Sequence, residues 1–293
     1  MVFDSRTGRT RTLANETDTL VRFASELSPD CLLICEATGG HEAGLLAATV
    51  ASGVPAHRAD ARKVKAFIRS FGTLGKTDAI DARALAQYGH ERHAMLMRWQ
   101  PTDVQREQLQ ALVLTRRDLA AAKQAWSNRM GAAGAAIVKP YLQAQLDYLA
   151  SQIAAIDIAI EDLIRDHAAL HEAAQIMRSV VGIGQRTAAA LLALMPELGT
   201  LNRSQAAALA GLAPHPKQSG MMDAYRRTKG GRPEVKRALF MAAMVAAKYN
   251  KPLKAFYEKL IAAGKKKLVA LIAVMRKLVI ICNATIRDAQ LAK

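Results

Sequence analysis

The stretch Leu32-Leu33-Ile34-Cys35-Glu36-Ala37-Thr38-Gly39-Gly40 decides the fold of the first third of the chain, because it ends an apolar run with an acid and a glycine turn. We predict a strand over 31–36, a helix over 42–51, a second strand over 54–58 and a second helix over 62–71. This order implies a right-handed crossover between parallel strands, hence an α/β domain. Ligands of such sheets collect at the carboxyl ends of strands, where Glu36 lies.

A second acidic motif follows about forty residues later, Gly75-Lys76-Thr77-Asp78-Ala79-Ile80-Asp81-Ala82-Arg83. We predict that Thr77 caps a helix whose first turn contains Asp78 and Asp81. Positions three apart lie on one helical face, so both carboxylates can aim at one point. Together with Glu36 they are the oxygen ligands that divalent metal ions prefer in proteins.

An ordinary helix start is the alternative explanation of this motif. Asp78 would then occupy the favourable first turn, and Asp81 would pair with Arg83 or Arg62 on the surface. Glu36 is harder to explain in this way, because an acid that closes a buried strand needs a partner or a metal.

The positive charge is concentrated in the last quarter of the chain. The 293 residues, about two domains in length, have a net charge of +16, and residues 214–293 alone contain 18 basic and 4 acidic side chains. A local basic excess is typical of a polyanion-binding surface, which favours nucleic acid as partner. Anionic membrane is the competing partner, but its best candidate, Leu268 to Cys282, is interrupted by Arg276-Lys277 and is too short to span.

The three cysteines form no CxxC pair, and the first residues show no signal-peptide pattern, so we expect a cytoplasmic, reduced protein.

The middle of the chain is predicted to be a helical hairpin. One helix runs from about Thr102 to Met130, and the helix after Pro140 carries apolar residues at alternating spacings of four and three, namely Leu142, Leu146, Leu149, Ile153, Ile156, Ile160 and Leu163. The apolar surface left over favours a homodimer or higher homo-oligomer. The alternative is a hairpin packed on its own domain.

A glycine turn precedes the next apolar helix. Gly182-Ile183-Gly184 is similar to a helix-hairpin-helix turn, in which backbone amides at a helix N-terminus approach a phosphate. An ordinary tight helical turn needs the same glycines, so both interpretations stay open.

A basic segment follows Ser219-Gly220. We interpret residues 221–233 as a glycine-rich polar loop before an apolar helix, suited to gripping a nucleic-acid backbone. Its candidate contacts, with the start of that helix, are Arg226, Arg227, Lys229, Arg232, Lys236 and Arg237. Lys265-Lys266-Lys267 adds a further basic patch, for which a solvated helix start is the alternative. Ser219 by itself is more typical of a phosphate hydrogen-bond donor than of a nucleophile.

In this order, the motifs resemble the DEDD transposases of the IS110 insertion-sequence family. The resemblance rests on the two acidic motifs, Gly182-Ile183-Gly184, Gly211-Leu212-Ala213-Pro214, Gln218-Ser219-Gly220 and Thr228-Lys229-Gly230-Gly231-Arg232-Pro233. It implies a RuvC-like (RNase H-like) α/β domain over 1–98, a coiled-coil hairpin over 99–170 and a mostly α serine transposase domain over 171–293.

The resemblance also implies the chemistry. Glu36, Asp78 and Asp81 would be three of four acids that hold Mg²⁺, Ser219 would be the nucleophile, and a bridge RNA would guide recombination of DNA. A serine–phosphate link would conserve the ester bond for strand exchange.

One departure concerns the first acid. The family opens with a strand that carries an acid, whereas this sequence opens with Met1-Val2-Phe3-Asp4, which resembles the stretch after that strand. Asp4 has no Gly-Ile before it, so we do not assign the first acid to it. The sequence therefore predicts a start codon placed downstream or a truncated copy. For a complete chain of this length it predicts weak or absent catalysis.

Two further functions compete with the recombinase. One is a nonenzymatic nucleic-acid-binding protein that keeps the basic C-terminal region. The other is a RuvC-like nuclease that hydrolyses DNA with water, in which Ser219 only contacts phosphate.

Overall fold

The computed structural model describes residues 1–72, 75, 77–101, 103–132, 134–219 and 222–292; between residues 216 and 226 it describes backbone only. The chain divides into two compact units, residues 1–102 and 103–293. The predicted division into three domains at 98 and 170 stays a prediction.

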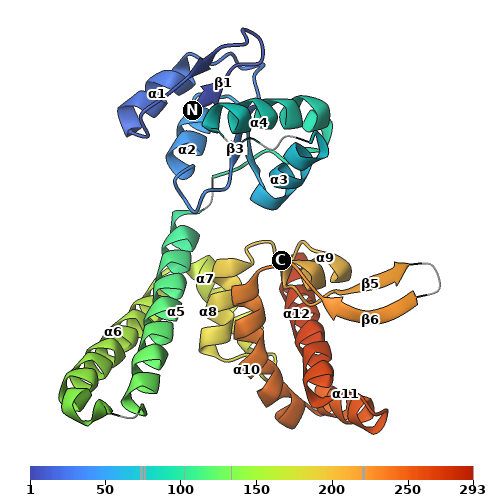
Figure 1. Cartoon of the computed structure of the whole chain (residues 1–293). Coiled ribbons are helices and arrows are strands. Elements are labelled where there is room, and N and C mark those ends of the chain that lie inside the picture. Colours follow the sequence, from blue (N-terminus) through green and yellow to red (C-terminus); the bar gives the residue numbers. More distant parts are fainter. Residues whose placement is uncertain (73–74, 76, 102, 133, 220–221, 293) are drawn as a thin grey trace. The chain divides into compact units, whose positions relative to one another are not determined.

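The first unit contains the predicted parallel pair of strands. Its elements are β1 (Val2–Phe3), β2 (Thr10–Arg11), α1 (Thr17–Ser25), β3 (Leu33–Glu36), α2 (Ala43–Ala51), β4 (Ala56–Ala59), α3 (Ala61–Ser70) and α4 (Asp78–Arg92), followed by the short 3-10 helix His93–Met95 (Figure 1). Strand β3 pairs in parallel with β4, with Glu36 opposite Ala59, and α2 forms the crossover. The α/β prediction for this unit is therefore confirmed at the level of strands and helices.

Helices α3 and α4 both begin at a capping side chain, and the cap of α4 is the predicted Thr77. Asp60 accepts hydrogen bonds from the backbone amides of Arg62 and Lys63 at the start of α3. The Thr77 hydroxyl accepts from the Ile80 amide at 3.2 Å and starts α4. Helix α4 then packs on β3 at Gly89, where a Cβ atom would overlap the Ile34 side chain. The Thr77 cap and this contact fix the position of the first turn of α4, which carries Asp78 and Asp81.

Strand β3 is less buried than the sequence suggests. All four of its residues, Glu36 included, are half-buried. Among the described residues β3 is hydrogen-bonded to β4 alone, so its other edge has no neighbouring strand there. The expectation that Glu36 closes a buried strand is wrong, and the burial argument for a metal at Glu36 weakens accordingly.

The second unit is helical with one β-hairpin. Its elements are α5 (Val104–Met130), a 3-10 turn (Ala135–Val138), α6 (Lys139–Asp166), α7 (Ala168–Arg178), α8 (Gln185–Leu194), α9 (Arg203–Leu209), β5 (Pro214–Ser219), β6 (Met222–Thr228), α10 (Pro233–Tyr249), α11 (Lys251–Ala262) and α12 (Lys267–Leu291). Helices α5 and α6 lie side by side as the predicted hairpin (Figure 1). Of the predicted seam, Leu142, Leu149 and Ile160 are buried.

Helices α8, α10 and α12 form the core of this unit. Seven of the ten residues of α8 are buried, as are Leu239, Ala242 and Ala246 of α10. Helix α12 has 25 residues and, by length and composition alone, is long and apolar enough to cross a membrane. The length argument from Leu268 to Cys282 is therefore wrong. One face of α12, including Val274 and Leu278, is buried in the protein core.

Most of the basic segment after Ser219 is a strand, whereas its glycine-rich end, residues 229–232, is the predicted loop before α10. Residues Met222–Thr228 pair antiparallel with Pro214–Ser219, and Figure 1 shows this β-hairpin projecting from the helices. The loop prediction for residues 222–228 was wrong because it relied on glycine and charge content. It overlooked the pairing with Pro214–Ser219, which supplies the backbone hydrogen bonds of the strand. At the base of the hairpin Gly211 and Gly231, both with positive φ, approach each other so closely that neither tolerates a Cβ atom.

The two glycines of the turn before α8 do different work. Gly182 has φ of +110°, and a Cβ atom there would lie 2.7 Å from the Cβ of Ala246 and 2.9 Å from the carbonyl oxygen of Ala242. Gly184 has φ of −88° and is the N-cap of α8. No atom lies within 4 Å of a Cβ atom built on it. Gly182 therefore serves close packing, whereas Gly184 leaves the start of α8 open.

We predict that Gly182→Ala destabilises the protein by about 2–4 kcal/mol, because it combines backbone strain with a clash against α10. Gly184→Ser is the matched control, since serine is a favourable N-cap at an extended backbone position and should leave stability within about 0.5 kcal/mol. Urea unfolding followed by circular dichroism measures both. Equal stability of the two variants would contradict the packing role of Gly182.

Candidate functional site

The three candidate metal-binding acids lie in the first unit on two packed elements. Glu36 ends β3 and is half-buried, Asp78 is exposed in the first turn of α4, and Asp81 is half-buried one turn further on. Within the described part of the chain, none of the three side chains has a hydrogen-bond or ion-pair partner. The surface pairs that the alternative explanation required are absent there: Arg62 pairs with Asp60, and Arg83 lies over the Phe3 ring. The carboxylates are therefore available to a ligand.

The structure does not group the three acids into a metal centre. Carboxylate oxygens are the right donors for a hard divalent cation. Among the described residues, however, no three His, Cys, Asp or Glu side chains converge closely enough to hold a metal ion. The donor chemistry fits a divalent ion, whereas a complete site is not formed by these residues.

Asp4 serves a turn. Its carboxylate accepts hydrogen bonds from the Arg6 amide at 2.9 Å and from the Thr7 hydroxyl at 3.0 Å, in the connection between β1 and β2. These bonds, the one from the Arg6 amide first, hold the pKa of Asp4 below its ordinary value. The Asp4 carboxylate therefore stabilises the turn between β1 and β2.

Glu42, which the sequence did not single out, holds the loop that follows Glu36. Its carboxylate accepts hydrogen bonds from the amides of Thr38 and Gly40 and from the Thr38 hydroxyl, at 3.0 to 3.1 Å. Its second oxygen pairs with the Arg58 guanidinium of β4 at 2.6 Å. The side chain of Glu42 is only 4% exposed, so these bonds replace its hydration. Glu42 and Arg58 thereby tie the loop after β3 to both strands.

The signal for this clamp was present in the sequence. The signal is a glutamate two residues after the Gly39-Gly40 turn, together with an arginine in the next predicted strand. Burial by itself raises the pKa of Glu42, but the backbone, Thr38 and Arg58 hydrogen bonds outweigh burial and lower that pKa to about 2.

Ser219 is the last residue of β5 and pairs with Met222, the first residue of β6. Its side chain, like that of Arg226, lies outside the described residues. Arg227 is exposed in β6, opposite His215, and Lys229 is exposed just after the strand. The structure therefore places Ser219 at the far end of a hairpin and these two cations nearer its base.

The other predicted contacts are partly engaged within the protein. Arg232 makes two hydrogen bonds to Glu197, at 2.5 and 2.7 Å, and one to the carbonyl of Leu194 at 2.7 Å. Burial raises the pKa of Glu197, but the hydrogen bonds from Arg232 outweigh it and lower that pKa below its usual value. Lys236 donates to the Thr228 hydroxyl at 3.1 Å. Arg232 and Lys236 therefore fix the hairpin to the helices.

Arg237 remains more open to solvent. Its side chain is 68% exposed and lies 3.6 Å from Glu234, which also pairs with Arg117 at 3.0 Å. An exposed pair at this distance contributes little and exchanges readily for a phosphate. Arg227, Lys229 and Arg237 are thus the best placed of the predicted cations, and we call them the hairpin surface.

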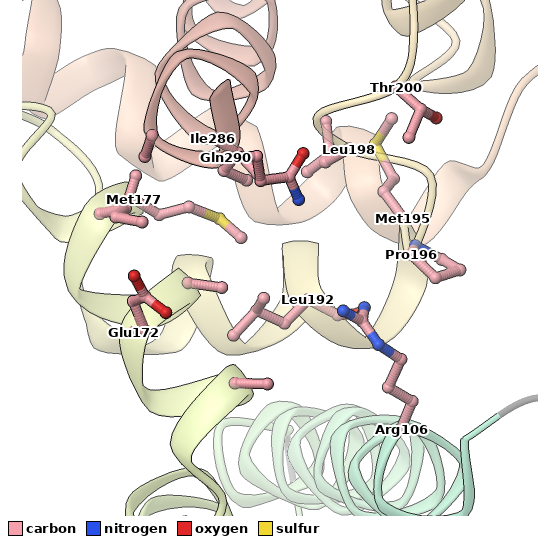
Figure 2. Close-up of a pocket in the computed structure, with 14 residues that line it drawn as sticks. Arg106, Glu172, Met177, Leu192, Met195, Pro196, Leu198, Thr200, Ile286 and Gln290 are labelled. Carbon is pink, nitrogen blue, oxygen red and sulfur yellow. The ribbon is translucent and has the colours of Figure 1, made fainter. Parts of the chain in front are cut away.

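Two cavities lie in the second unit. One, of about 260 Å³, is shown in Figure 2; Arg106 and Gln290 border it, and Met177, Leu192 and Met195 supply apolar walls. The Arg106 guanidinium donates to the carbonyl of Leu192. The other, of about 290 Å³, is lined by residues that include Arg116, Asp157, Gln185 and Arg186, at the start of α8.

Two of the three cysteines, Cys35 and Cys282, do not supply a nucleophile. Burial raises the pKa of Cys35 and of Cys282 to about 12, so both thiols stay protonated at neutral pH.

Comparison with known proteins assigns the chain to a family. A sequence model of DEDD transposases of the IS110 type, described as "Transposase", matches residues 2–133, and a second, described as "Transposase IS116/IS110/IS902 family", matches residues 174–258. The first match contains the three acids, and the second contains the glycine turn and Ser219.

Curated relatives agree with this assignment. A pilin gene-inverting protein of Moraxella lacunata is 30% identical over 261 residues, 87% of this chain and 80% of the relative. Its counterpart from Moraxella bovis is 31% identical over 77% of this chain and 70% of the relative. An uncharacterized 43.6 kDa protein of insertion element IS110 from Streptomyces coelicolor is 31% identical over 52% and 37% of the two chains.

Both sequence models describe proteins that move DNA. The chain belongs to the IS110 family of transposases. This membership supports a transposase or recombinase function with DNA as partner, in a family that generally uses a divalent metal ion.

We predict that Glu42→Gln removes an acid-dependent part of the stability of the first unit. The folded pKa of Glu42 is depressed, so its contribution of roughly 3 kcal/mol is present above the ordinary value of 4.5 and is lost as the pH falls toward about 2. The fluorescence of Trp99, in a Trp126→Phe background, reports urea unfolding between pH 2 and 7. The variant should be less stable at pH 7 and show a flatter pH profile.

Glu16→Gln is the control for this measurement, because Glu16 is exposed and makes no side-chain capping bond. If Glu42→Gln kept the same pH profile as the parent chain, the clamp would carry no stability.

Proposed function

We propose that this chain is a site-specific DNA recombinase of an insertion sequence, which cuts and rejoins DNA through a covalent link to Ser219. The observation that carries the proposal is the position of Ser219 at the end of a basic β-hairpin, within a chain that matches the two IS110-family models in order. The names of the Moraxella relatives support inversion of a DNA segment as one form of this activity.

The proposed covalent step is balanced as follows. The Ser219 oxygen attacks a backbone phosphorus, the serine proton is lost, and the bond from phosphorus to one strand end breaks, which leaves that end as a hydroxyl. A hydroxyl of the exchanging strand then attacks the phosphoserine, and the serine oxygen leaves and regains a proton. One phosphodiester is exchanged for another without an external energy source.

The hairpin surface supports this step electrostatically. Arg227 lies on β6, Lys229 lies just after β6, and Arg237 lies near the start of α10. They would hold flanking phosphates on the DNA backbone, which fixes position without reading sequence. Arg226 belongs to the same proposal from the sequence. The turn at Gly182 and Gly184 is proposed as a further nucleic-acid contact, apart from the hairpin surface.

We propose Glu36, Asp78 and Asp81 as the chain's ligands for Mg²⁺. Their oxygen donors and their lack of partners among the described residues support this assignment. Bound Mg²⁺ would neutralise charge that develops on the phosphate. In the chain itself, the hydrogen bonds of Glu42 hold the loop directly after Glu36 in place.

The proposal also includes a bridge RNA as guide, assembly as a homodimer or higher oligomer, and a location in the cytoplasm. Guide pairing would carry the sequence information, so protein contacts would fall mainly on backbone. Tyr141 and Tyr148, seven residues apart on α6, are 78% and 59% exposed and offer an apolar face to a second copy.

We predict that Ser219→Ala abolishes a covalent protein–DNA adduct while DNA binding stays within about threefold. Denaturing electrophoresis of the chain with end-labelled DNA, RNA and Mg²⁺ detects the adduct. Ser204→Ala, an exposed serine at the start of α9, is the matched control and should keep it. Cleavage without any adduct would favour the water-using nuclease, and binding without cleavage under every divalent ion would favour the nonenzymatic module.

We predict that Asp78→Asn or Asp81→Asn reduces metal-dependent strand cleavage at least about a hundredfold, since each removes a charged oxygen ligand. Asp18→Asn, an exposed acid in the first turn of α1, is the matched control. Cleavage is titrated against Mg²⁺, and binding of Mn²⁺ is followed separately by its electron paramagnetic resonance signal. Unchanged Mn²⁺ binding in both variants would refute the metal assignment whether or not the chain is active.

A further inference from the structure

A second basic surface lies at the end of α10 opposite the hairpin. Residues 248–267 contain seven lysines and one acid, and all seven lysines are exposed. Lys248 is near the end of α10, Lys251 and Lys254 lie in the first turn and a half of α11, and the others extend to the start of α12 (Figure 1). We call Lys248, Lys251 and Lys254 the distal surface.

The distal surface adjoins the open start of α8. The Asn250 side chain, between Lys248 and Lys251, donates to the carbonyl oxygen of Val181 at 3.2 Å. Gly182 packs against Ala246 one turn earlier in α10. These contacts bring the glycine turn beside the lysines, because Asn250 is at most two residues from Lys248 and Lys251.

The start of α8 adds its own attraction for anions. Gly184, Gln185 and Arg186 are exposed, and no side chain caps the helix at Gly184. The first amides of an uncapped helix carry unsatisfied donors and a partial positive charge. The cavity of about 290 Å³ at the same place is lined by two arginines, Arg116 and Arg186, and by two acids, Asp157 and Glu161, so it adds no net positive charge. Lysines and helix start therefore form one electropositive region.

Acidic groups neutralise little of this charge. Within the described part of the chain, Lys254 alone among the three lysines has an acidic partner, Glu258 at 4.0 Å. Arg186 pairs with Asp157 at 2.8 Å but is 74% exposed. Unpaired exposed cations are what a phosphate backbone contacts.

The distal surface is separate from the hairpin surface. Residues 238–247 of α10 contain no charged side chain, and Met241, Met244 and Val245 are exposed in the middle of the helix. Helix α10 has 17 residues, so its two ends are about 25 Å apart. The apolar middle interrupts any continuous row of phosphate contacts between them.

We propose that the distal surface binds the phosphate backbone of a second nucleic-acid segment, so that one second unit holds two segments at once. This extends the proposed function, since it rests on nucleic-acid binding at the hairpin surface, but it requires no catalysis. The ligand chemistry is a phosphodiester backbone, which DNA and RNA share.

The test is a bridging assay with the full chain in EDTA. An immobilised 20-base-pair DNA duplex captures a labelled duplex, either DNA or RNA, only when the protein holds both. We compare the distal variant Lys248→Gln/Lys251→Gln/Lys254→Gln with the hairpin variant Arg227→Gln/Lys229→Gln/Arg237→Gln. Lys63→Gln/Lys65→Gln/Lys139→Gln, three exposed lysines elsewhere, is the charge-matched control.

The distal variant should lose bridging about tenfold or more, and its binding to a single duplex should change less than about threefold. The control should bridge like the parent chain. The duplex type whose capture falls identifies DNA or RNA as the ligand. Bridging that persists in the distal variant overturns the proposal, because two copies using the same hairpin surface would then explain it.

Two further measurements separate the remaining outcomes. Loss of binding to phosphatidylserine vesicles in the distal variant, with bridging unchanged, would assign the surface to a membrane and overturn the proposal. If the hairpin variant kept full affinity for a single duplex and the distal variant still lost bridging, the hairpin surface would be refuted as the DNA site of the proposed function, and the distal surface would remain supported. If the triple variant unfolds, Lys251→Gln alone is tested. The slope of log affinity against log salt should then fall by about the amount that one phosphate contact contributes, and an unchanged slope refutes the proposal.

Discussion

The close packing of α10 against its neighbours is the constraint on which the second unit depends. Small buried residues, Ala242, Ala243 and Ala246, let the glycine turn before α8 approach the helix backbone. At the other end of α10, Arg232 ties the hairpin base to Glu197 and the end of α8. Because any larger side chain would force these contacts apart, the apolar interior of α10 fixes the spacing between the hairpin and the glycine turn.

That spacing separates the positive charge of the second unit into two surfaces. Charge is excluded from the ten middle residues of α10 and appears at both ends, on the hairpin and on the α11 side. Some of the predicted nucleic-acid contacts are used inside the protein, as Arg232 shows. Basic residues in a sequence therefore indicate the partner's class, whereas the packing decides which cations remain free to meet it.

In the first unit, a buried polar clamp has the corresponding role. Glu42 is satisfied by two amides, a hydroxyl and Arg58, so it can stay ionised under the glycine loop. The three candidate metal acids have no partners among the described residues, and they do not converge into a metal site there.

The sequence by itself determined the family, the parallel strand pair, the cap at Thr77 and the localisation of charge, because these depend on local spacing and composition. It missed the β5–β6 hairpin, since cross-strand pairing is not visible in the composition of one strand. It overestimated the burial of β3 and underestimated the length of α12. Only the tertiary structure decided that Arg232 pairs with Glu197, that Glu42 is a clamp and that Lys248 adjoins the glycine turn, because contacts between distant residues depend on how helices pack.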